Sequence, residues 1–350
     1  MDKISIGLIG AGGNTRSRHI PGFKAIDGVE IISVANRSIE SGQKVADEFA
    51  IPKVAGDWME ILEDEEVDAV CIGTWPYMHA SLTIAALEHG KHVLCEARMA
   101  MNSDEGHEML ATSRLCPGQI AQIVPAPHTL AFDQTIIEKI SSGGIGDLIA
   151  IDARITTPSD FPNRDSALHW RHERDLSGNN VMSMGIWYEA MMRWVGPAAS
   201  AFALGQAVVP HRLDATGKRV PTPIPDHIDV VGELAQGGQM RFNVSTVVGH
   251  APAAADVHIF GTEGTLRLHQ GNDTAMALYY GARGDAGLSE LAIDPAKRGV
   301  WRVEEEFINA IRGVEPVTHT DLRTAATYME WTDAVAHSAR TGERVTLPLS

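Results

Sequence analysis

The sequence of 350 residues has little cysteine, few aromatic side chains and a shortage of positive charge. Its three cysteines, Cys71, Cys95 and Cys116, lack the spacing of a metal site, so we expect no metal and reduced thiols in a cytoplasmic protein. Lys and Arg number 29 against 45 Asp and Glu, and the net charge of -16 argues against nucleic acid as a partner. No apolar run reaches the roughly 18 residues of a membrane span, and the first residues do not resemble a signal peptide.

A glycine-rich turn follows the first apolar run of the chain. Ile4–Ile9 reads as a strand, and Gly10-Ala11-Gly12 follows it directly. Gly10 permits a tight turn, Gly12 lets the backbone approach phosphates, and a helix from about Thr15 aims its free N–H groups at them. We therefore predict that Gly10, Gly12, Asn14 and Thr15 bind a dinucleotide, although Thr15 stands where a third glycine is expected. The alternative is a simple strand-to-helix turn.

The second strand, Val29–Ala35, ends where a dinucleotide-binding domain meets the adenosine ribose. An acidic residue there would hold both ribose hydroxyls, but this chain has neutral Asn36 and cationic Arg37. Arg37 can pair with a 2′-phosphate or stack on adenine. We therefore predict that both residues bind the cofactor and that NADP is preferred over NAD. The alternative is a turn followed by a helix cap at Ser38.

Strands and helices alternate through the first third of the chain. Buried strands at 67–73 and 92–96 flank a helix at 80–89, which predicts a doubly wound parallel sheet of the Rossmann type over residues 1–123. Ligands bind at the carboxyl ends of the strands in such sheets. The loop at 74–79 lies at one of these ends, so we also predict cofactor contacts from Thr74, Trp75, His79 and Glu96. For His79 a packing or capping role is the equal alternative.

Residues 124–350 have a different pattern and predict a second α/β domain. A strand at 148–156, a hairpin over 228–248 and closely spaced strands up to residue 280 indicate an open, largely antiparallel sheet. Helices are expected at 132–142, 181–195, 303–311 and 322–341. The polar stretch 158–177 has no clear period, and a loop of that length is usually functional or mobile. We expect its first part, 158–173, to close over a substrate.

Several stretches together resemble the Gfo/Idh/MocA oxidoreductase family. The most specific is the run Gly90-Lys91-His92-Val93-Leu94-Cys95-Glu96, and it is accompanied by the glycine-rich turn, the 74–79 loop, Trp170-Arg171, Gly261-Thr262-Glu263-Gly264-Thr265 and Thr341-Gly342. The resemblance covers nearly the whole chain. It implies a Rossmann domain followed by an α/β domain, NAD(P), and hydride transfer at a secondary alcohol of a sugar, cyclitol or glycoside. It also implies oligomers packed through the second sheet.

The sequence departs from that family at the catalytic positions. The family pattern Glu-Lys-Pro reads Glu96-Ala97-Arg98 here, so the lysine is absent. The family motif Gly-x-His-x-x-Asp begins at Gly185, where this chain places Trp187 at the His and Ala190 at the Asp. Some relatives carry a Tyr in place of that His, and Tyr188 is one residue away.

Oxidation of an alcohol requires a group that accepts the hydroxyl proton. Tyr188 is our preferred candidate, because a neighbouring cation can lower the pKa of a phenol, and its alternative is a packed residue with a satisfied hydroxyl. Arg98 stays protonated and can orient a substrate or stabilise an alkoxide, or else form a salt bridge. Glu96 is read as an orienting group near the nicotinamide, or as a structural hydrogen-bond acceptor.

The densest polar cluster, residues 169–173, offers donors, acceptors and an aromatic face, which suits a polyol. Its two histidines are three residues apart without a third ligand nearby, so we expect no metal there. His128 follows the crossover into the second domain, where a satisfied histidine between domains is the alternative. The predicted substrate-binding residues are His128, His169, Trp170, Arg171, His172 and Trp187.

These observations favour an NAD(P)-dependent oxidoreductase acting on a sugar-like secondary alcohol. Two alternatives stay open because the lysine and histidine are missing. One is a lyase or hydrolase that oxidises and re-reduces its substrate with no net redox change, and the other is a non-catalytic dinucleotide or sugar binder. We expect a homo-oligomer, a dimer or tetramer, with a small-molecule partner and no association with membranes.

Overall fold

The computed structural model describes residues 3–349, and its contacts divide the chain into two compact units. The first unit contains the residues up to 125 together with 302–329, and the second contains 126–301 together with the residues from 330 onward. The predicted boundary between residues 123 and 124 stays a prediction. The sequence did not predict that residues 302–329 return to the first unit, because no local pattern indicates this return.

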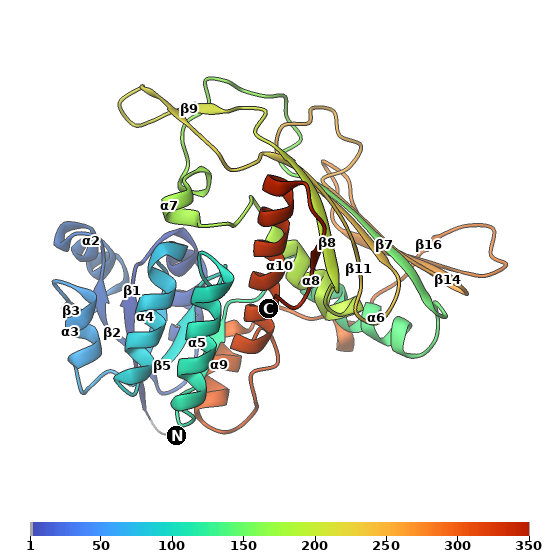
Figure 1. Cartoon of the computed structure of the whole chain (residues 1–350). Coiled ribbons are helices and arrows are strands. Elements are labelled where there is room, and N and C mark those ends of the chain that lie inside the picture. Colours follow the sequence, from blue (N-terminus) through green and yellow to red (C-terminus); the bar gives the residue numbers. More distant parts are fainter. Residues whose placement is uncertain (1–2, 350) are drawn as a thin grey trace. The chain divides into compact units, whose positions relative to one another are not determined.

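The first unit is built on a parallel sheet. Among the described residues this sheet has six strands in the order β3-β2-β1-β4-β5-β6, which is the order of a dinucleotide-binding Rossmann sheet (Figure 1). The predicted fold of this part is therefore confirmed. The strands are β1 (Ile4–Ile9), β2 (Val29–Ala35), β3 (Lys53–Val54), β4 (Ala69–Ile72), β5 (His92–Cys95) and β6 (Ala121–Ile123).

Helices connect these parallel strands, as crossover connections require. They are α2 (Ile39–Phe49), α3 (Trp58–Glu63), α4 (Pro76–Glu88) and α5 (Ser103–Leu115). The helix expected from about Thr15 begins as a short π-helix, η1 (Thr15–His19), and continues as α1 (Ile20–Lys24). Pro21 does not break this helix, because it lies in the first turn of α1, where a missing N–H costs no helical hydrogen bond.

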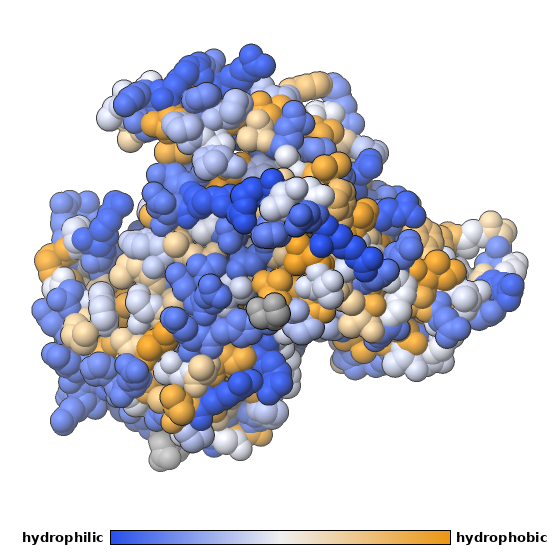
Figure 2. Space-filling model, in the orientation of Figure 1, coloured by the Kyte–Doolittle hydropathy of each residue, from blue (hydrophilic) through white to orange (hydrophobic). Residues whose placement is uncertain are grey.

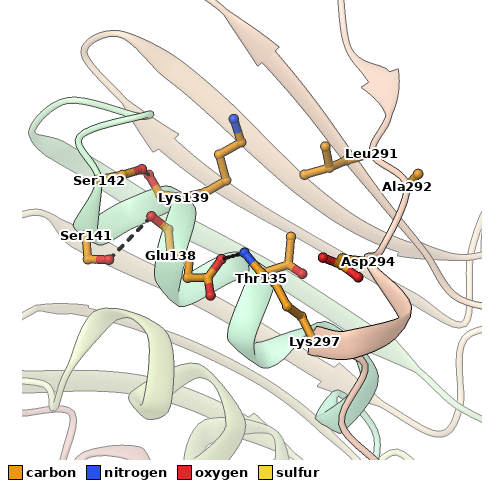
Figure 3. A pocket seen from close by; sticks show the side chains of 9 residues that line it. All are labelled: Thr135, Glu138, Lys139, Ser141, Ser142, Leu291, Ala292, Asp294 and Lys297. Atoms are coloured by element: carbon orange, nitrogen blue, oxygen red, sulfur yellow. Dashed lines mark hydrogen bonds and ion pairs between the residues drawn. The ribbon is translucent and has the colours of Figure 1, made fainter.

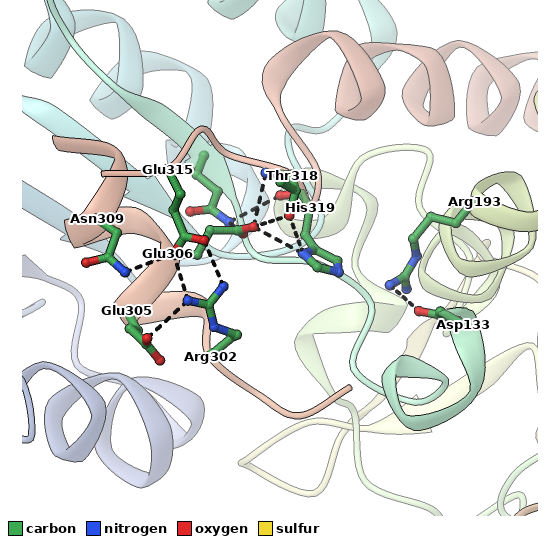
Figure 4. Close-up of polar contacts among 10 residues, drawn as sticks. Asp133, Arg193, Arg302, Glu305, Glu306, Asn309, Glu315, Thr318 and His319 are labelled. Carbon is green, nitrogen blue, oxygen red and sulfur yellow. Dashed lines mark hydrogen bonds and ion pairs between the residues drawn. The ribbon is translucent and has the colours of Figure 1, made fainter. Parts of the chain in front are cut away.

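The segment 302–329 is tied to the first unit by buried polar contacts. It contains α9 (Val303–Ile311) and the first turns of α10 (Leu322–Thr341). Glu306 of α9 accepts a hydrogen bond of 2.6 Å from the side-chain amide of Gln122 on β6, and also bonds Thr318 and His319 (Figure 4). Burial raises the pKa of Glu306, but hydrogen bonds from His319 and Thr318 outweigh it and lower the pKa to about 2. The carboxylate therefore fixes this segment against β6.

The second unit is built on a mixed sheet that has nine strands among the described residues. Their order is β16-β15-β14-β13-β7-β12-β11-β8-β17. β7 and β12 run parallel and the other neighbours antiparallel, which confirms the predicted largely antiparallel sheet. The strands are β7 (Leu148–Thr156), β8 (Ser200–Gln206), β11 (His227–Glu233), β12 (Gln239–Ser245), β13 (Ala255–Gly261), β14 (Gly264–Gln270), β15 (Ala277–Ala282), β16 (Ser289–Glu290) and β17 (Val345–Thr346).

Aromatic side chains join two helices to one face of this sheet. Tyr188 of α8 (Met184–Val195) stacks on Trp331 of α10, and Trp331 stacks in turn near Phe242 of β12. A third helix, α6 (Leu130–Ser141), packs against α8, where Asp133 accepts a 2.7 Å hydrogen bond from Arg193 (Figure 4). Asp133 also accepts a 2.7 Å hydrogen bond from the indole of Trp194. These contacts form the core of the second unit.

The polar stretch 158–177 is partly ordered into short helices, η2 (Trp170–His172) and α7 (Arg174–Ser177). It pairs with a two-stranded arm formed by β9 (His211–Leu213) and β10 (Arg219–Pro221), which the sequence did not predict. Leu213 exchanges backbone hydrogen bonds with Ser166 and Leu168, so the stretch and the arm form one lobe. A second 3₁₀ helix, η3 (Pro295–Lys297), follows β16 in the chain.

Hydrophilic side chains cover most of the face shown in Figure 2, with hydrophobic ones interspersed. Within residues 3–349, every helix is too short or too polar to cross a membrane.

Candidate functional site

The glycine-rich turn between β1 and η1 leaves open space above its backbone. Gly10 has a φ of +83°, and a Cβ there would lie 2.8 Å from the Thr74 nitrogen, so the turn requires glycine. A Cβ on Gly12 would meet the Gly73 oxygen at an ordinary 3.5 Å, and one on Gly13 would meet nothing within 4 Å. A hollow of about 490 Å³ lies here, lined by Ala11, Gly12, Gly13, Arg16, Ser17 and Glu48. The turn is thus a cradle that a side chain would fill, which fits a pyrophosphate.

Two predicted cofactor residues brace this turn. Thr15, which replaces the third glycine, is fully buried and donates a 3.3 Å hydrogen bond to the Gly10 carbonyl. The Asn36 side chain accepts a 2.7 Å hydrogen bond from the Ala11 N–H and donates to the Ser41 carbonyl. Both residues therefore shape the cradle through their own contacts. Arg37, next to Asn36, is exposed to solvent at the end of β2.

His79 connects the loops that follow β4 and β5. Its ring is completely buried, with Nδ1 2.8 Å from the Arg98 carbonyl and Nε2 3.1 Å from the Thr74 carbonyl. Burial lowers the pKa of His79, so the ring is neutral at pH 7 and donates to one of the two carbonyls. His79 therefore sets the spacing of these loops, while Thr74 and the neighbouring Trp75 are partly exposed at the sheet edge.

Glu96 lies at the carboxyl end of β5, where its side chain forms hydrogen bonds with three other residues. Its carboxylate accepts hydrogen bonds from the Asn14 side chain, from His19 at 3.0 Å and from the Ala97 N–H at 3.1 Å. Burial raises the pKa of Glu96, but the hydrogen bonds from His19 and Asn14 outweigh it and hold the pKa below the ordinary value. Glu96 is therefore an ionised carboxylate linked to the glycine-rich turn.

His19 and Glu304 belong to this cluster, and the sequence reasoning missed both. His19 Nδ1 lies 2.5 Å from the Glu304 carboxylate, and both side chains are almost fully buried. His19 follows Gly10 by nine residues, and this closeness to the glycine-rich turn is a local signal for a role near it. Glu304 had no such signal, because it lies 285 residues away in the chain.

The residues that replace the family's lysine motif are Ala97 and Arg98. Ala97 has no ionisable group. Arg98 is 2% exposed, and its carbonyl accepts from His79. Its guanidinium is therefore buried and does not face solvent at the edge of the sheet.

Tyr188, the preferred candidate for proton transfer, lies in the core of the second unit. It is 1% exposed, stacks on Trp331 with the ring centroids 3.9 Å apart, and accepts a 2.8 Å hydrogen bond from the Ala198 N–H. Burial raises the pKa of Tyr188, and the hydrogen bond from the Ala198 N–H offsets this only in part. These surroundings match the packing alternative, and they lend no support to Tyr188 as an acid or base.

Trp187 and His128 do come together, as a stacked pair with ring centroids 5.2 Å apart. Trp187 is almost fully buried, whereas His128 is exposed. Glu189, next in the chain, accepts hydrogen bonds from the Ala126 N–H and from Arg193, which explains its burial as structural. The pair therefore presents the His128 ring, backed by an indole.

The remaining predicted substrate residues form the surface of the lobe made by 158–177 and the arm. The guanidinium of Arg171 lies over the Trp170 ring at 4.2 Å, and the rings of His169 and His172 are 6.2 Å apart. Each histidine Nδ1 accepts a backbone hydrogen bond within this turn. Burial, followed by the charge of Arg212, lowers the pKa of His172 to about 4, so this ring is neutral at pH 7.

A separate hollow of about 520 Å³ lies between α6 and η3 (Figure 3). It is lined by Thr135, Glu138, Lys139, Ser141, Ser142, Leu291, Ala292, Asp294 and Lys297. An ion pair between Glu138 and Lys297 spans one side, and Lys139 covers the Tyr280 ring. None of the predicted site residues lines this hollow, so we do not assign it to the same site.

The chain matches two family models. Residues 4–115 match the oxidoreductase family with an NAD-binding Rossmann fold, and residues 134–267 match the GFO/IDH/MocA C-terminal domain. A trans-1,2-dihydrobenzene-1,2-diol dehydrogenase of Bos taurus is 26% identical over 76% of this chain and 72% of its own length. A 1,5-anhydro-D-fructose reductase of Ensifer adhaerens is 33% identical over 50% of this chain and 51% of its own length.

Solved structures share the fold along the whole chain. A levoglucosan dehydrogenase in complex with NADH and L-sorbose superposes with a TM-score of 0.84 at 20% identity, covering 99% of both chains. One family model falls in each unit, and the six-stranded parallel sheet with its glycine-rich cradle agrees with the first. The chain therefore belongs to the Gfo/Idh/MocA family of NAD-binding oxidoreductases.

Proposed function

We propose that this protein is an NAD(P)-dependent dehydrogenase or reductase that acts on a secondary alcohol of a sugar, glycoside or cyclitol. The observation that carries the proposal is the open cradle at Gly12 and Gly13, joined through Asn14 to the ionised Glu96 at the carboxyl edge of the sheet. The bound cofactor supplies hydride transfer. The residues of this chain bind it, orient it and hold the charge around it.

The cradle binds the pyrophosphate through the backbone of Gly10, Gly12 and Asn14, with Thr15 and Asn36 fixing its shape. Family membership supports NAD(H) as a cofactor, and we extend this to a preference for NADP. The end of β2 carries Asn36 and the exposed Arg37 in place of a carboxylate, and a guanidinium there suits a 2′-phosphate.

A ring-shaped polyol or its ketone is the substrate class that we favour. Relatives and structural neighbours are named for levoglucosan, 1,5-anhydro-D-fructose and a dihydrobenzene diol, which are all cyclic compounds with secondary alcohol or ketone groups. In this chain, the Trp170 face, the Arg171 guanidinium and the two histidines beside them offer apolar contact and hydrogen bonds together. His128 on Trp187 offers a second platform of the same kind.

The proton of the reacting alcohol needs an acceptor other than a lysine, because Ala97 stands at that position. We retain Glu96 as a group that contacts the reacting end of the cofactor, and Arg98 as a cation beside it in sequence. Tyr188 remains a candidate by sequence, but its buried phenol and raised pKa argue against it as the proton acceptor.

A second candidate function is binding without net redox turnover, and one observation favours it. Ala97, Trp187 and Ala190 replace all three ionisable groups of the family motifs. Such a protein would bind the cofactor and a sugar, or catalyse elimination or hydrolysis through transient oxidation.

One experiment separates these functions. The purified protein is incubated with NAD and NADP and a panel of sugars, anhydrosugars and cyclitols, and absorbance of the reduced cofactor is followed together with product analysis. Steady growth of the reduced cofactor supports the oxidoreductase. Product without net cofactor change indicates the lyase or hydrolase, and tight cofactor binding with neither result indicates a binder.

We also propose a homo-oligomer that packs through the outer face of the nine-stranded sheet. Three strands expose large apolar side chains there: β8 with Leu204, β11 with Val231 and β13 with Phe260. Apolar side chains gathered on one face are typical of an interface. Sedimentation of the parent and of Leu204→Glu tests the interface, because the variant should shift toward monomer.

We also propose a cytoplasmic location. The three free cysteines fit a reducing compartment of that kind.

A further inference from the structure

His19 lies between two carboxylates, one on each side of its ring. Nδ1 is 2.5 Å from Glu304 and Nε2 is 3.0 Å from Glu96. A neutral imidazole has one N–H and would leave one carboxylate facing a lone pair. Two acceptor carboxylates on opposite nitrogens are satisfied together only by an imidazolium. The contact geometry by itself therefore favours a protonated His19 inside the first unit.

Glu304 reaches His19 because α9 packs closely on the helix after the glycine-rich turn. A Cβ on Gly22 would lie 2.7 Å from the Glu304 carboxylate, so Gly22 provides the space for it. The rings of Phe23 and Phe307 meet edge to face at 6.4 Å in the same contact. The segment 302–329 thus places the buried Glu304 carboxylate against η1, which directly follows the glycine-rich turn.

Glu96 is the member of this cluster that faces outward. Its side chain is 15% exposed, against 0% for His19 and 3% for Glu304. In the strand order, β2 meets the adenosine, β1 the pyrophosphate, and β4 and β5 lie on the far side, which is the nicotinamide side. Glu96 follows β5 and therefore stands on the nicotinamide side of the cradle.

We propose that His19, held by Glu304, is a positioning residue that keeps Glu96 ionised and fixed beside the nicotinamide, and that this charge favours the oxidised cofactor over the reduced one. The nicotinamide ring is cationic only when oxidised, so a fixed carboxylate discriminates between the two forms. The inference rests on the proposed function, because it requires that the first unit bind NAD(H) or NADP(H).

The titratable groups around His19 agree with this arrangement. Burial lowers the pKa of His19, but hydrogen bonds to Glu304 and Glu96 outweigh it and raise the pKa to about 9. Cys71 on β4 interacts with both carboxylates, and burial raises the pKa of this thiol well above its usual range. His79 and Cys95 interact with Glu96, and burial lowers the pKa of His79 and raises that of Cys95, so all three groups are neutral at pH 7. At pH 7 His19 is therefore an imidazolium and Glu96 an ionised carboxylate.

Two measurements test the inference, and the first needs no cofactor. NMR titration of the histidine rings in the intact protein should give a pKa for His19 near 9, with the signal assigned by its loss in His19→Gln. In Glu304→Gln this pKa should fall by a unit or more, roughly the effect of losing one charged partner. Glu305→Gln is the matched control, because Glu305 is an exposed neighbour on the same helix. An ordinary His19 pKa in the parent would overturn the proposal.

The second measurement is the dissociation constant of the oxidised and of the reduced cofactor, with whichever of NAD or NADP binds more tightly. In Glu304→Gln and Glu96→Gln the preference for the oxidised form should fall by roughly threefold or more, the size of a partly exposed charge interaction. Equal ratios in parent and variants overturn the proposal even if cofactor binds. A parent that binds neither form refutes the proposed function instead, and the His19 titration then reports on the cluster separately.

Discussion

The ring of Tyr188 stacks on Trp331 with centroids 3.9 Å apart and planes inclined by 5°. This contact joins α8 to α10 in the core of the second unit, and the phenol accepts the Ala198 N–H beside it. Tyr188, one residue after the position of the family's histidine, is thus a packed core residue. The adjacent Trp187 faces another partner, His128, because neighbouring residues on a helix point about 100° apart.

Removing the Tyr188 hydroxyl tests packing against proton transfer. Tyr188→Phe keeps the stacked ring but leaves the buried Ala198 N–H without its acceptor, so we expect a loss of about 1–3 kcal/mol in the free energy of unfolding. Urea denaturation measures it. Turnover with the best substrate should stay near the parent value, and a large fall in turnover with unchanged stability would restore Tyr188 as the proton acceptor.

Filling the cradle should abolish cofactor binding without harming the fold. Gly12→Val introduces a branched side chain where the structure has open space, with its Cβ in ordinary contact with the Gly73 oxygen. Gly118→Val is the control, since a Cβ there meets nothing within 4 Å and lies in a different loop. Calorimetric titration with NADH and NADPH checks this. Retained affinity in Gly12→Val would place the cofactor elsewhere.

Arg37 should decide between the two cofactors. Arg37→Ala removes an exposed guanidinium at the end of β2, and we expect NADP binding to weaken by roughly 1.5–3 kcal/mol while NAD binding changes little. Arg114→Ala, an exposed change on α5, serves as the control for net charge. If the parent binds NAD as tightly as NADP, the preference for NADP is wrong.

Arg171 should act on the substrate and leave the cofactor unaffected. In Arg171→Ala the cation over the Trp170 ring is lost, so we expect KM for the substrate to rise severalfold. The dissociation constant of the cofactor should not move. Arg174→Ala, on the adjoining short helix, is the comparison. Loss of cofactor affinity in Arg171→Ala would assign this lobe to the other ligand.

The His19 cluster also predicts how stability depends on pH. The pKa of His19 is raised to about 9 in the folded protein, above its ordinary 6.5. Its contribution is therefore fully present below pH 6.5 and is lost as the pH rises through 9. Denaturation midpoints measured from pH 6 to 10 should fall in the parent and fall less in His19→Gln. Parallel curves for the two proteins would mean that the folded state does not hold this proton.

The sequence by itself determined the strands, the parallel sheet and the cradle, because these follow from local pattern. Apolar β-branched runs such as 29–35 form buried strands, and a Gly-x-Gly turn after the first strand requires the left-handed conformation seen at Gly10. Helices 303–311 and 322–341 were predicted with their observed ends. The arm at 211–221 was missed, since its strands are only three residues long and the second ends in Pro221.

Tertiary structure alone decided which polar groups act together. Glu304 meets His19 across 285 residues because α9 returns to the first unit, and no periodicity encodes that return. The same holds for Tyr188: its type and position suggested chemistry, but burial against Trp331 raises the pKa of its phenol and places it in the core. Side-chain identity sets what a residue can do, whereas the burial and partners that select one of those uses come from distant segments packed around it.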